Sequence, residues 1–284
     1  MSKDINQLVN EIDPNGRMII DPICQKLIEV GSSEIETFIK RFTTSEESRI
    51  RWNLAYVLGE LKSNNAIDVL ISALRDQNGL VREQAARALG KIRDKRAVDA
   101  LMRSLKSDER YDVREIAAWA LGEIGDEGAI PALIDAIADE EIEVEDNAID
   151  SLMRLATSDS SLLIDALTRD NEQIQCGAME VLSHLGISNV QNHLIELLSH
   201  HSGRVRNCAV QALKSSTSLE LFPHFLICLK DKYDLVRANA ASALGELGDR
   251  RAIEPLQSLL GDPSERVRVS ALQALTSIQD PLSL

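Results

Sequence analysis

The hydrophobic positions of the chain recur in short stripes separated by charged and small polar residues. In residues 113–139 the first stripe has the three-and-four spacing of a helix face: Val113, Ala117, Ala120, Leu121 and Ile124. Gly125 and Asp126 then provide a helix end and a cap for the next helix. A second stripe follows over residues 129–137. The stretch is therefore predicted to form two short helices packed against each other.

The same stretch recurs along the chain, and one column of mostly arginine marks its copies. The marker column holds Arg51, Arg82, Arg114, Glu145, Gln175, Arg206, Arg237 and Arg268. The steps between these markers are 31, 32, 31, 30, 31, 31 and 31 residues, and each marker is followed seven positions later by leucine. A fixed period in this range is typical of a solenoid of stacked helix pairs.

The pattern V-R-x-x-A-A-x-A-L-G-x-I-G-D-x-x-A-I-P-x-L resembles the HEAT repeat, in the short form named after phycobilisome lyases, over roughly residues 33–279. The resemblance implies an all-α fold, a right-handed α–α superhelix (HEAT-repeat solenoid) of about eight helix pairs with an N-terminal cap. The expected domains are a helical cap (1–32), a solenoid of eight repeats (33–279) and a tail (280–284). The expected pairs are 33–61, 65–92, 96–124, 128–156, 159–185, 189–215, 218–247 and 251–279.

Residues 4–30 do not fit the repeat columns. They indicate one short helix, a break at Pro14-Asn15-Gly16, and a second helix over residues 19–30. A first repeat needs its open face covered, so a cap is the favoured interpretation, with a docking arm as the alternative. At the other end, the exposed side of the last helix is predicted to be polar, through Ser270, Gln273 and Ser277.

In HEAT families the marker arginine commonly pairs with the aspartate ahead of it, which forms a ladder between repeats. Aspartates stand at the expected places before four markers: Asp76, Asp108, Asp231 and Asp262. The ladder is expected to break in repeats four and five, where Asp139 precedes Glu145 and Asp170 precedes Gln175. Two interpretations are open: drift in repeats that tolerate it, or a hinge across residues 139–185.

Composition narrows the function. The formal net charge of −14 argues against a general nucleic-acid binder, because such proteins bind phosphates with lysine and arginine, and it suits a basic partner. The N-terminus shows no signal peptide, and no segment has the roughly 20 apolar residues of a membrane span. The four cysteines show no paired framework. A cytoplasmic protein with reduced cysteines is expected, as a monomer or a weak dimer.

The resemblance also implies that the second helix of each pair lines the concave face of the solenoid. Positions one, two, five and nine after each marker are expected to point outward there. Exposed tryptophan and tyrosine are typical anchors of protein interfaces, and Arg87 is placed to stack on a tryptophan. The predicted partner-binding residues are Trp52, Asn53, Tyr56, Arg87, Glu115, Trp119, Glu123, Asp146 and Asp150. The alternative is that Trp52 and Trp119 fold over neighbouring helices as partial core.

Other chemistry finds little support in the chain. The acidic run from Asp139 to Asp146 is read as a solvated helix start, with a basic partner and then a divalent cation as alternatives. The five histidines lack metal-ligand spacing, and no nucleophile, phosphate-binding or dinucleotide motif is present, so no cofactor is expected. The favoured function is a non-enzymatic scaffold that binds a basic or amphipathic segment of another protein. The alternative, from the repeat type, is a bilin lyase-type subunit or a chromophore-protein chaperone.

Overall fold

The computed structural model describes residues 5–12, 22–155, 160–186, 190–214, 216 and 218–279, and all regular elements of these ranges are helices. Tertiary contacts divide the chain into two compact units, Met1–Ser158 (unit 1) and Asp159–Leu284 (unit 2), and each is described by itself. The predicted break at Pro14-Asn15-Gly16 and the predicted tail 280–284 lie outside the described residues.

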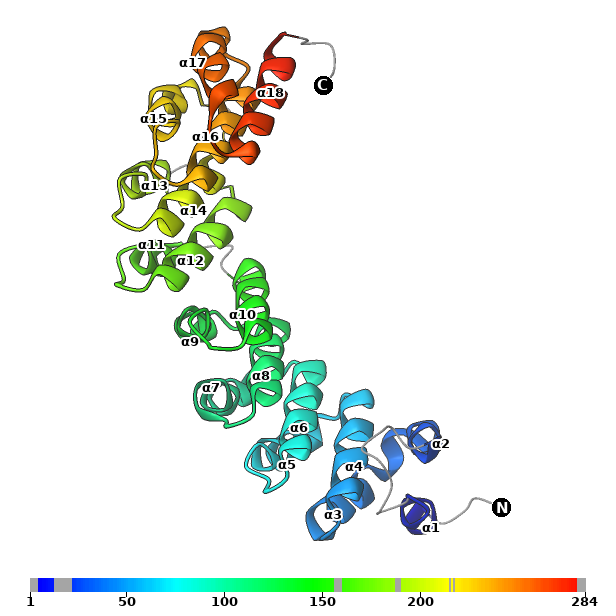
Figure 1. Ribbon diagram of the computed structural model, residues 1–284. Helices are drawn as coiled ribbons and strands as arrows, with labels where there is room; N and C mark the ends of the chain where they lie inside the picture. The colour runs from blue at the N-terminus through cyan, green and yellow to red at the C-terminus, as the bar shows by residue number, and fades with distance from the viewer. Residues whose placement is uncertain are drawn as a thin grey trace. The chain divides into compact units, whose positions relative to one another are not determined.

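Unit 1 contains two N-terminal helices and four helix pairs (Figure 1). Their bounds are α1 (Ile5–Asn10), α2 (Pro22–Val30), α3 (Ile35–Thr44), α4 (Ser48–Glu60), α5 (Ile67–Ala73), α6 (Gly79–Ile92), α7 (Val98–Ser107), α8 (Tyr111–Ile124), α9 (Ile130–Ala136) and α10 (Ile142–Leu155). The second helices of the pairs, α4, α6, α8 and α10, pack one against the next and are called the second-helix row. The first helices, α3, α5, α7 and α9, form the other row, and α2 packs on α4.

Unit 2 repeats this arrangement with four more pairs (Figure 1). Their bounds are α11 (Ser161–Ala166), α12 (Glu172–His184), α13 (Gln191–Leu197), α14 (Gly203–Lys214), α15 (Phe222–Cys228), α16 (Asp234–Leu247), α17 (Ile253–Ser258) and α18 (Glu265–Gln279). Short 3-10 turns introduce or join many pairs: Gly31–Glu34, Asn64–Ala66, Lys95–Ala97, Glu127–Ala129, Leu219–Leu221, Arg250–Ala252 and Leu259–Gly261. The predicted all-α fold of eight helix pairs is confirmed, while the predicted domain boundaries and the hinge across residues 139–185 stay predictions.

Two of the turns that join successive helix pairs use the glycine and aspartate that the pattern indicated. Gly125 ends α8 with φ of 77°, a left-handed conformation that favours glycine. The Asp126 carboxylate then accepts a hydrogen bond from the Gly128 N–H at 2.9 Å. In unit 2, Gly248 and Asp249 form the same turn between α16 and α17. The prediction of a helix end followed by a cap is therefore confirmed.

The exposed side of the last helix is less polar than predicted. Val269 and Leu272 on α18 are 46% and 58% exposed, while Gln273 and Ser277 are exposed as expected. The three-residue spacing puts Val269 and Leu272 on one face, so this face of α18 carries an apolar strip.

An arginine ladder links successive repeats within each unit. Arg82 donates from Nε and Nη2 to the Asp108 carboxylate at 2.7 and 2.8 Å, and its Nη1 donates to the Asp76 carbonyl at 3.0 Å. The same two-pronged pairing joins four other arginines to aspartates 25 residues later: Arg51–Asp76, Arg114–Asp139, Arg206–Asp231 and Arg237–Asp262. Paired nitrogens and oxygens of this geometry make strong, directional bonds.

The ladder runs in the opposite direction to the one expected. Each arginine binds the carboxylate of the following repeat and only the backbone carbonyl of the residue six positions ahead of it. Asp139 therefore does not face Glu145 as a like-charge pair, because its carboxylate binds Arg114. The missing rungs begin at Glu145 and Gln175, which lack a guanidinium. The Gln175 amide donates instead to the Leu167 carbonyl of its own repeat, at 3.1 Å.

The ladder predicts how stability depends on pH. Burial opposes the charged form of Asp76, but hydrogen bonds from Arg51 and from the Asn78 N–H outweigh it and hold the pKa of Asp76 below its usual range. Arg114 and Arg206 have the same effect, against burial, on the pKa of Asp139 and of Asp231. Each lowered pKa adds stability that is present above the unfolded-state value of about 4 and is lost as the pH falls through the folded-state value.

We therefore expect the urea midpoint to be level from neutral pH to about pH 5 and to fall steeply below about pH 4. The contribution of each rung is modest because the carboxylates are partly solvated. Urea titrations at a series of pH values test this. An unfolding free energy that stays constant between about pH 5 and pH 3 would contradict it.

Candidate protein-interaction surface

The predicted binding residues lie on the second-helix row of unit 1. Trp52 and Tyr56 come from α4, Glu115 and Trp119 from α8, and all four side chains are half-buried. Asp146 and Asp150 are exposed on α10. Positions one, five and nine after each marker recur on one face of each helix and together form a partly exposed strip across the row.

Asn53 does not belong to this strip, and the prediction that it points outward is wrong. The side chain is 0% exposed, with its Nδ2 donating to the Arg49 carbonyl at 3.0 Å and its Oδ1 lying 3.1 Å from the Cys24 sulphur. The equivalent residues of the next repeats, Gln84 and Ile116, are each 5% exposed. Position two after the marker therefore faces the preceding helix of the row, because Cys24 belongs to α2, which packs on α4.

Trp119 combines the two interpretations that the sequence left open. A Cβ atom added to Gly90 would lie 2.6 Å from Cζ3 of Trp119, so the indole covers this glycine of α6. The ring is thus partial core, and only its outer part is available to a partner. The predicted stacking of Arg87 on a tryptophan is not found among the described side chains, since the Arg87 guanidinium donates to Glu83 on its own helix at 3.0 Å.

Position nine after the marker forms ion pairs between neighbouring helices. Glu60 pairs with Lys91, whose Nζ also lies 5.4 Å from the centre of the Tyr56 ring. Glu123 pairs with Arg93, and its other oxygen accepts from Nη1 of Arg154 at 2.5 Å. Arg93 donates to Glu123 strongly enough to hold the pKa of that carboxyl below its usual range, against some burial. Glu123 is therefore ion-paired with Arg93 and Arg154, so its charge is not available in the way that the predicted role of supplying charge to a partner requires.

Negative charge remains in excess around Glu115. We call Glu83, Asp112, Glu115 and Glu143 the acidic row; it runs over the first two turns of α6, α8 and α10. Burial raises the pKa of Glu115, the Arg87 guanidinium lowers it, and repulsion from Glu83, Glu143 and Asp112 raises it further, with a net upward shift. Arg87 and Arg110 offset part of the charge through their pairs with Glu83 and Asp112. Proton binding at Glu115 is thus favoured first by burial and then by repulsion from its acidic neighbours, and a cationic side chain would relieve the repulsion.

A family model for HEAT repeats matches residues 35–121, 104–168 and 222–284 of this chain. The chain belongs to the HEAT-repeat family. The matched segments span the four helix pairs of unit 1 and the last two pairs of unit 2, and the resemblance drawn from the repeat pattern is confirmed.

Comparison with solved structures finds several chains of low sequence identity. Human deoxyhypusine hydroxylase in complex with glycerol shares 23% identity with the chain, over 91% of this chain and 99% of that one, at a TM-score of 0.40. The CpcE–CpcF complex of phycocyanin lyase from Nostoc sp. PCC7120 shares 22% identity, over 86% and 94%, at 0.42. The YibA protein of Escherichia coli shares 21%, over 89% and 95%, at 0.47. No curated protein matches the chain.

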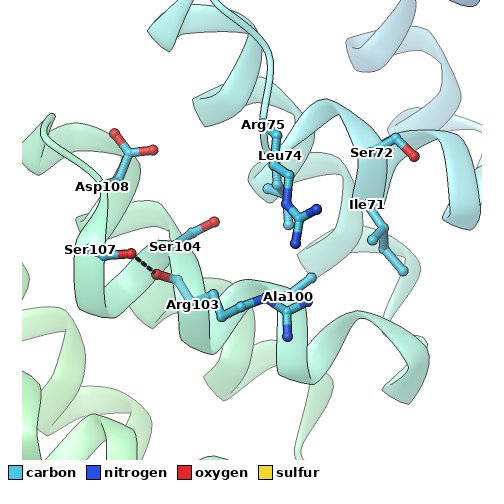
Figure 2. Close-up of a pocket in the computed structure, with 9 residues that line it drawn as sticks. All are labelled: Ile71, Ser72, Leu74, Arg75, Ala100, Arg103, Ser104, Ser107 and Asp108. Carbon is cyan, nitrogen blue, oxygen red and sulfur yellow. Dashed lines mark hydrogen bonds between the residues drawn. The ribbon is translucent and has the colours of Figure 1, made fainter.

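The HEAT-repeat chain also has a concavity on the first-helix row of unit 1. It measures about 330 Å³ between α5 and α7, and Figure 2 shows Arg75 and Arg103 reaching into it. Arg75 follows the end of α5 and Arg103 lies in the last turns of α7. Cations at these places offset the partial negative charge of helix C-termini, so the two arginines have a structural explanation.

The acidic run from Asp139 to Asp146 begins at a turn that is held by a hydrogen bond and lies near Arg114. Across the described part of the chain, no group of three or more histidine, cysteine or acidic side chains is arranged to hold a metal ion. Glu140 lies 4.0 Å from Arg114, and Asp139 caps the turn by accepting from the Glu141 N–H at 3.1 Å. In the same described ranges, no helix is both long and apolar enough to cross a membrane.

The cysteines depart from the prediction of four reduced thiols. Cys24 and Cys228 are buried and take part in no disulfide, whereas Cys176 and Cys208 form a disulfide between α12 and α14. Two surface residues were also overlooked as parts of the candidate site: Glu83, in the acidic row, and Lys91, beside Tyr56. The alternation of sign at position nine, Glu60, Lys91, Glu123 and Arg154, was the signal for the ion pairs between helices.

Proposed function

We propose that this HEAT-repeat protein is a protein-interaction scaffold whose second-helix row in unit 1 binds a basic or amphipathic segment of another protein. The observation that carries the proposal is the acidic row, where repulsion and burial raise the pKa of Glu115. A lysine or arginine of a partner placed there replaces repulsion by attraction. The neighbouring aromatic residues Trp52, Tyr56 and Trp119 supply half-buried apolar surface on the same row.

The other residues predicted to bind the partner contribute to this proposal to different extents. Asp146 and Asp150 are exposed on α10 and extend the negative surface beyond the acidic row. Arg87, which is bound to Glu83, limits the charge at the centre. Glu123 and Asn53 are left out, since one bridges two arginines and the other is buried. The partner thus contacts the face formed by positions one and five after each marker and not the C-terminal ends of the second helices.

A pull-down from the source organism's lysate tests the proposal, with the double variant Glu83→Gln/Glu115→Gln beside the wild type. Neutral isosteres are preferred to Trp119→Ala, which would also remove the cover of Gly90. Glu254→Gln/Glu265→Gln is the matched control, because it removes the same charge from exposed positions of unit 2. A basic partner that is lost with the first variant and kept with the control supports the proposal. A partner kept by both variants contradicts it.

Glu115→Gln alone should separate binding from folding. The raised pKa means that the charged form of Glu115 opposes folding once the pH is above the folded-state value, so the variant should gain about 0.5 kcal/mol of stability at neutral pH. The same variant should bind the captured partner about fivefold more weakly, and that loss should shrink as the pH falls toward the raised pKa of Glu115. Urea titration and a binding isotherm at two pH values measure both. A variant that is less stable at neutral pH than the wild type would refute the assignment.

The alternative from the repeat type, a bilin lyase-type subunit or chromophore-protein chaperone, predicts a different result. Such a protein would change the visible absorbance of a bilin on mixing. In that case the wild type would capture no basic protein, so Glu83→Gln/Glu115→Gln would behave like it in the pull-down. A Trp119 variant would alter the absorbance spectrum of the mixed bilin. Absence of a spectral change, together with capture of a basic protein, favours the scaffold.

A further inference from the structure

A covalent link joins two neighbouring helices of unit 2. Cys176 on α12 and Cys208 on α14 form a disulfide, 32 residues apart in sequence and 5.6 Å apart between Cα atoms. This Cα separation is what a disulfide needs, so the bond closes without movement of the backbone. Both residues are half-buried, and small reagents therefore have access to the sulphurs.

The disulfide lies where the arginine ladder has no rung. In unit 2, Arg206 and Arg237 each hold the aspartate of the following repeat. The repeat before them carries Gln175, whose amide stays within its own repeat, and His200 stands where the aspartate would be. The step from α12 to α14 thus has a disulfide beside the marker position and no bidentate ion pair.

The other two cysteines cannot substitute for this pair. Cys24 and Cys228 are buried, and burial raises the pKa of Cys228 to about 11, which keeps it a thiol. Cys176 and Cys208, by contrast, are both half-buried and already within bonding distance of each other. Reaction with thiols and disulfides is therefore directed to Cys176 and Cys208.

We propose that Cys176 and Cys208 are a reversible thiol–disulfide site, with low-molecular-weight thiols and disulfides of the glutathione class as reaction partners, and that its state sets the stability of the first two repeats of unit 2. In the oxidising direction, the Cys208 thiolate attacks a sulphur of glutathione disulfide and releases one glutathione thiolate. The Cys176 thiolate then attacks the Cys208 sulphur of the mixed disulfide and releases the second glutathione. The two cysteines lose two protons and two electrons, and the electrons end on the two glutathione thiols.

The disulfide thus links α12 and α14 only in the oxidised state. Oxidation closes a loop of 32 residues, which restricts the unfolded chain and favours the folded repeats. Reduction leaves α12 and α14 with packing and single hydrogen bonds, such as that from Ser183 to the Ala212 carbonyl at 3.3 Å. In the reducing cytoplasm that the sequence predicts, the thiols would be the resting state and the disulfide a response to oxidant.

The test uses the full chain equilibrated with glutathione disulfide or with excess dithiothreitol. Alkylation of free thiols followed by peptide mass spectrometry should find Cys176 linked to Cys208 after oxidation and both alkylated after reduction. The melting temperature of unit 2 should fall by about 10 °C on reduction. Both tryptophans belong to unit 1, so far-UV circular dichroism should report this transition while tryptophan fluorescence does not follow it.

Two variants control the measurement. Cys176→Ser/Cys208→Ser should melt with the reduced wild type and ignore the reductant, whereas Cys24→Ala/Cys228→Ala should keep the full response to it. If Cys24→Ala/Cys228→Ala fails to fold, hydrogen exchange of the wild type replaces this control. Exchange in α12 and α14 should then be faster on reduction, while exchange in α4 and α6 is unchanged. A melting temperature unaffected by the reductant, or oxidation that yields no Cys176–Cys208 peptide, overturns the proposal.

Discussion

Replacing Arg82 with alanine should lower the free energy of unfolding of unit 1 by about 3 kcal/mol. Arg82 is only 8% exposed and makes four hydrogen bonds that hold two successive repeats: two to the Asp108 carboxylate, one to the Glu109 carboxylate and one to the Asp76 carbonyl. The alanine leaves the Asp108 side chain, itself 7% exposed, as a nearly buried carboxylate without its guanidinium. The cost is mainly that of an unpaired charge and carbonyl, and it greatly exceeds the value of a surface ion pair.

The measurement can be confined to unit 1, because Trp52 and Trp119 are the only tryptophans of the chain and both lie there. Urea titration followed by tryptophan fluorescence should show the loss. Arg103→Ala is the matched control: Arg103 is exposed on α7, and its loss should change stability by less than about 0.5 kcal/mol. The double variant Arg82→Met/Asp108→Leu should return most of the stability, since it removes the buried charge together with its partner. If the double variant is as unstable as Arg82→Ala, packing and not unpaired charge is responsible.

The period and the turns of this protein could be predicted because they rest on local pattern. A stripe at three-and-four spacing buries one side of each helix, and Gly125-Asp126 ends and caps helices through bonds within a few residues. The direction of the ladder could not be predicted in the same way. Aspartates stand both six positions before Arg82 and 26 positions after it, so the sequence offers both partners with equal regularity. Only the stacking of repeats decides that the carboxylate of Asp108 is within reach.

Exposure on the second-helix row was the weakest part of the prediction, and the reason is the closeness of the helices. Gly90 lets α8 approach until Trp119 covers it, which half-buries the indole, and Asn53 is buried where α4 meets Cys24 of α2. One signal was present: the column of Asn53 also holds Ile116, an apolar residue that favours a buried column. A second signal concerned the cysteines. Cys176 and Cys208 are one residue more than a repeat period apart, so the period itself places them on neighbouring helices.

The close packing of neighbouring second helices also gives the second large expected effect, in unit 2. A Cβ atom at Gly245 of α16 would lie 2.7 Å from both Cα and Cβ of Ala274 on α18, and one of these atoms is backbone. Gly245→Val should therefore destabilise unit 2 by about 3 kcal/mol, because the two helices must separate to admit the side chain. Gly245→Ala should cost about 1 kcal/mol even though alanine is the better helix former by a similar amount.

Two further variants distinguish a steric clash from the loss of a flexible glycine. Gly261 has no atom within 4 Å of its added Cβ, so Gly261→Ala should change stability by less than about 0.5 kcal/mol. Ala274→Gly removes the methyl group that Gly245→Ala would meet, and the two changes together should cost less than the sum of each alone. Far-UV circular dichroism in urea, with tryptophan fluorescence as the unit 1 reference, measures each difference. Strict additivity of Gly245→Ala and Ala274→Gly would show that α16 and α18 do not depend on this contact, and the argument that the glycine column sets the spacing of the row would fail with it.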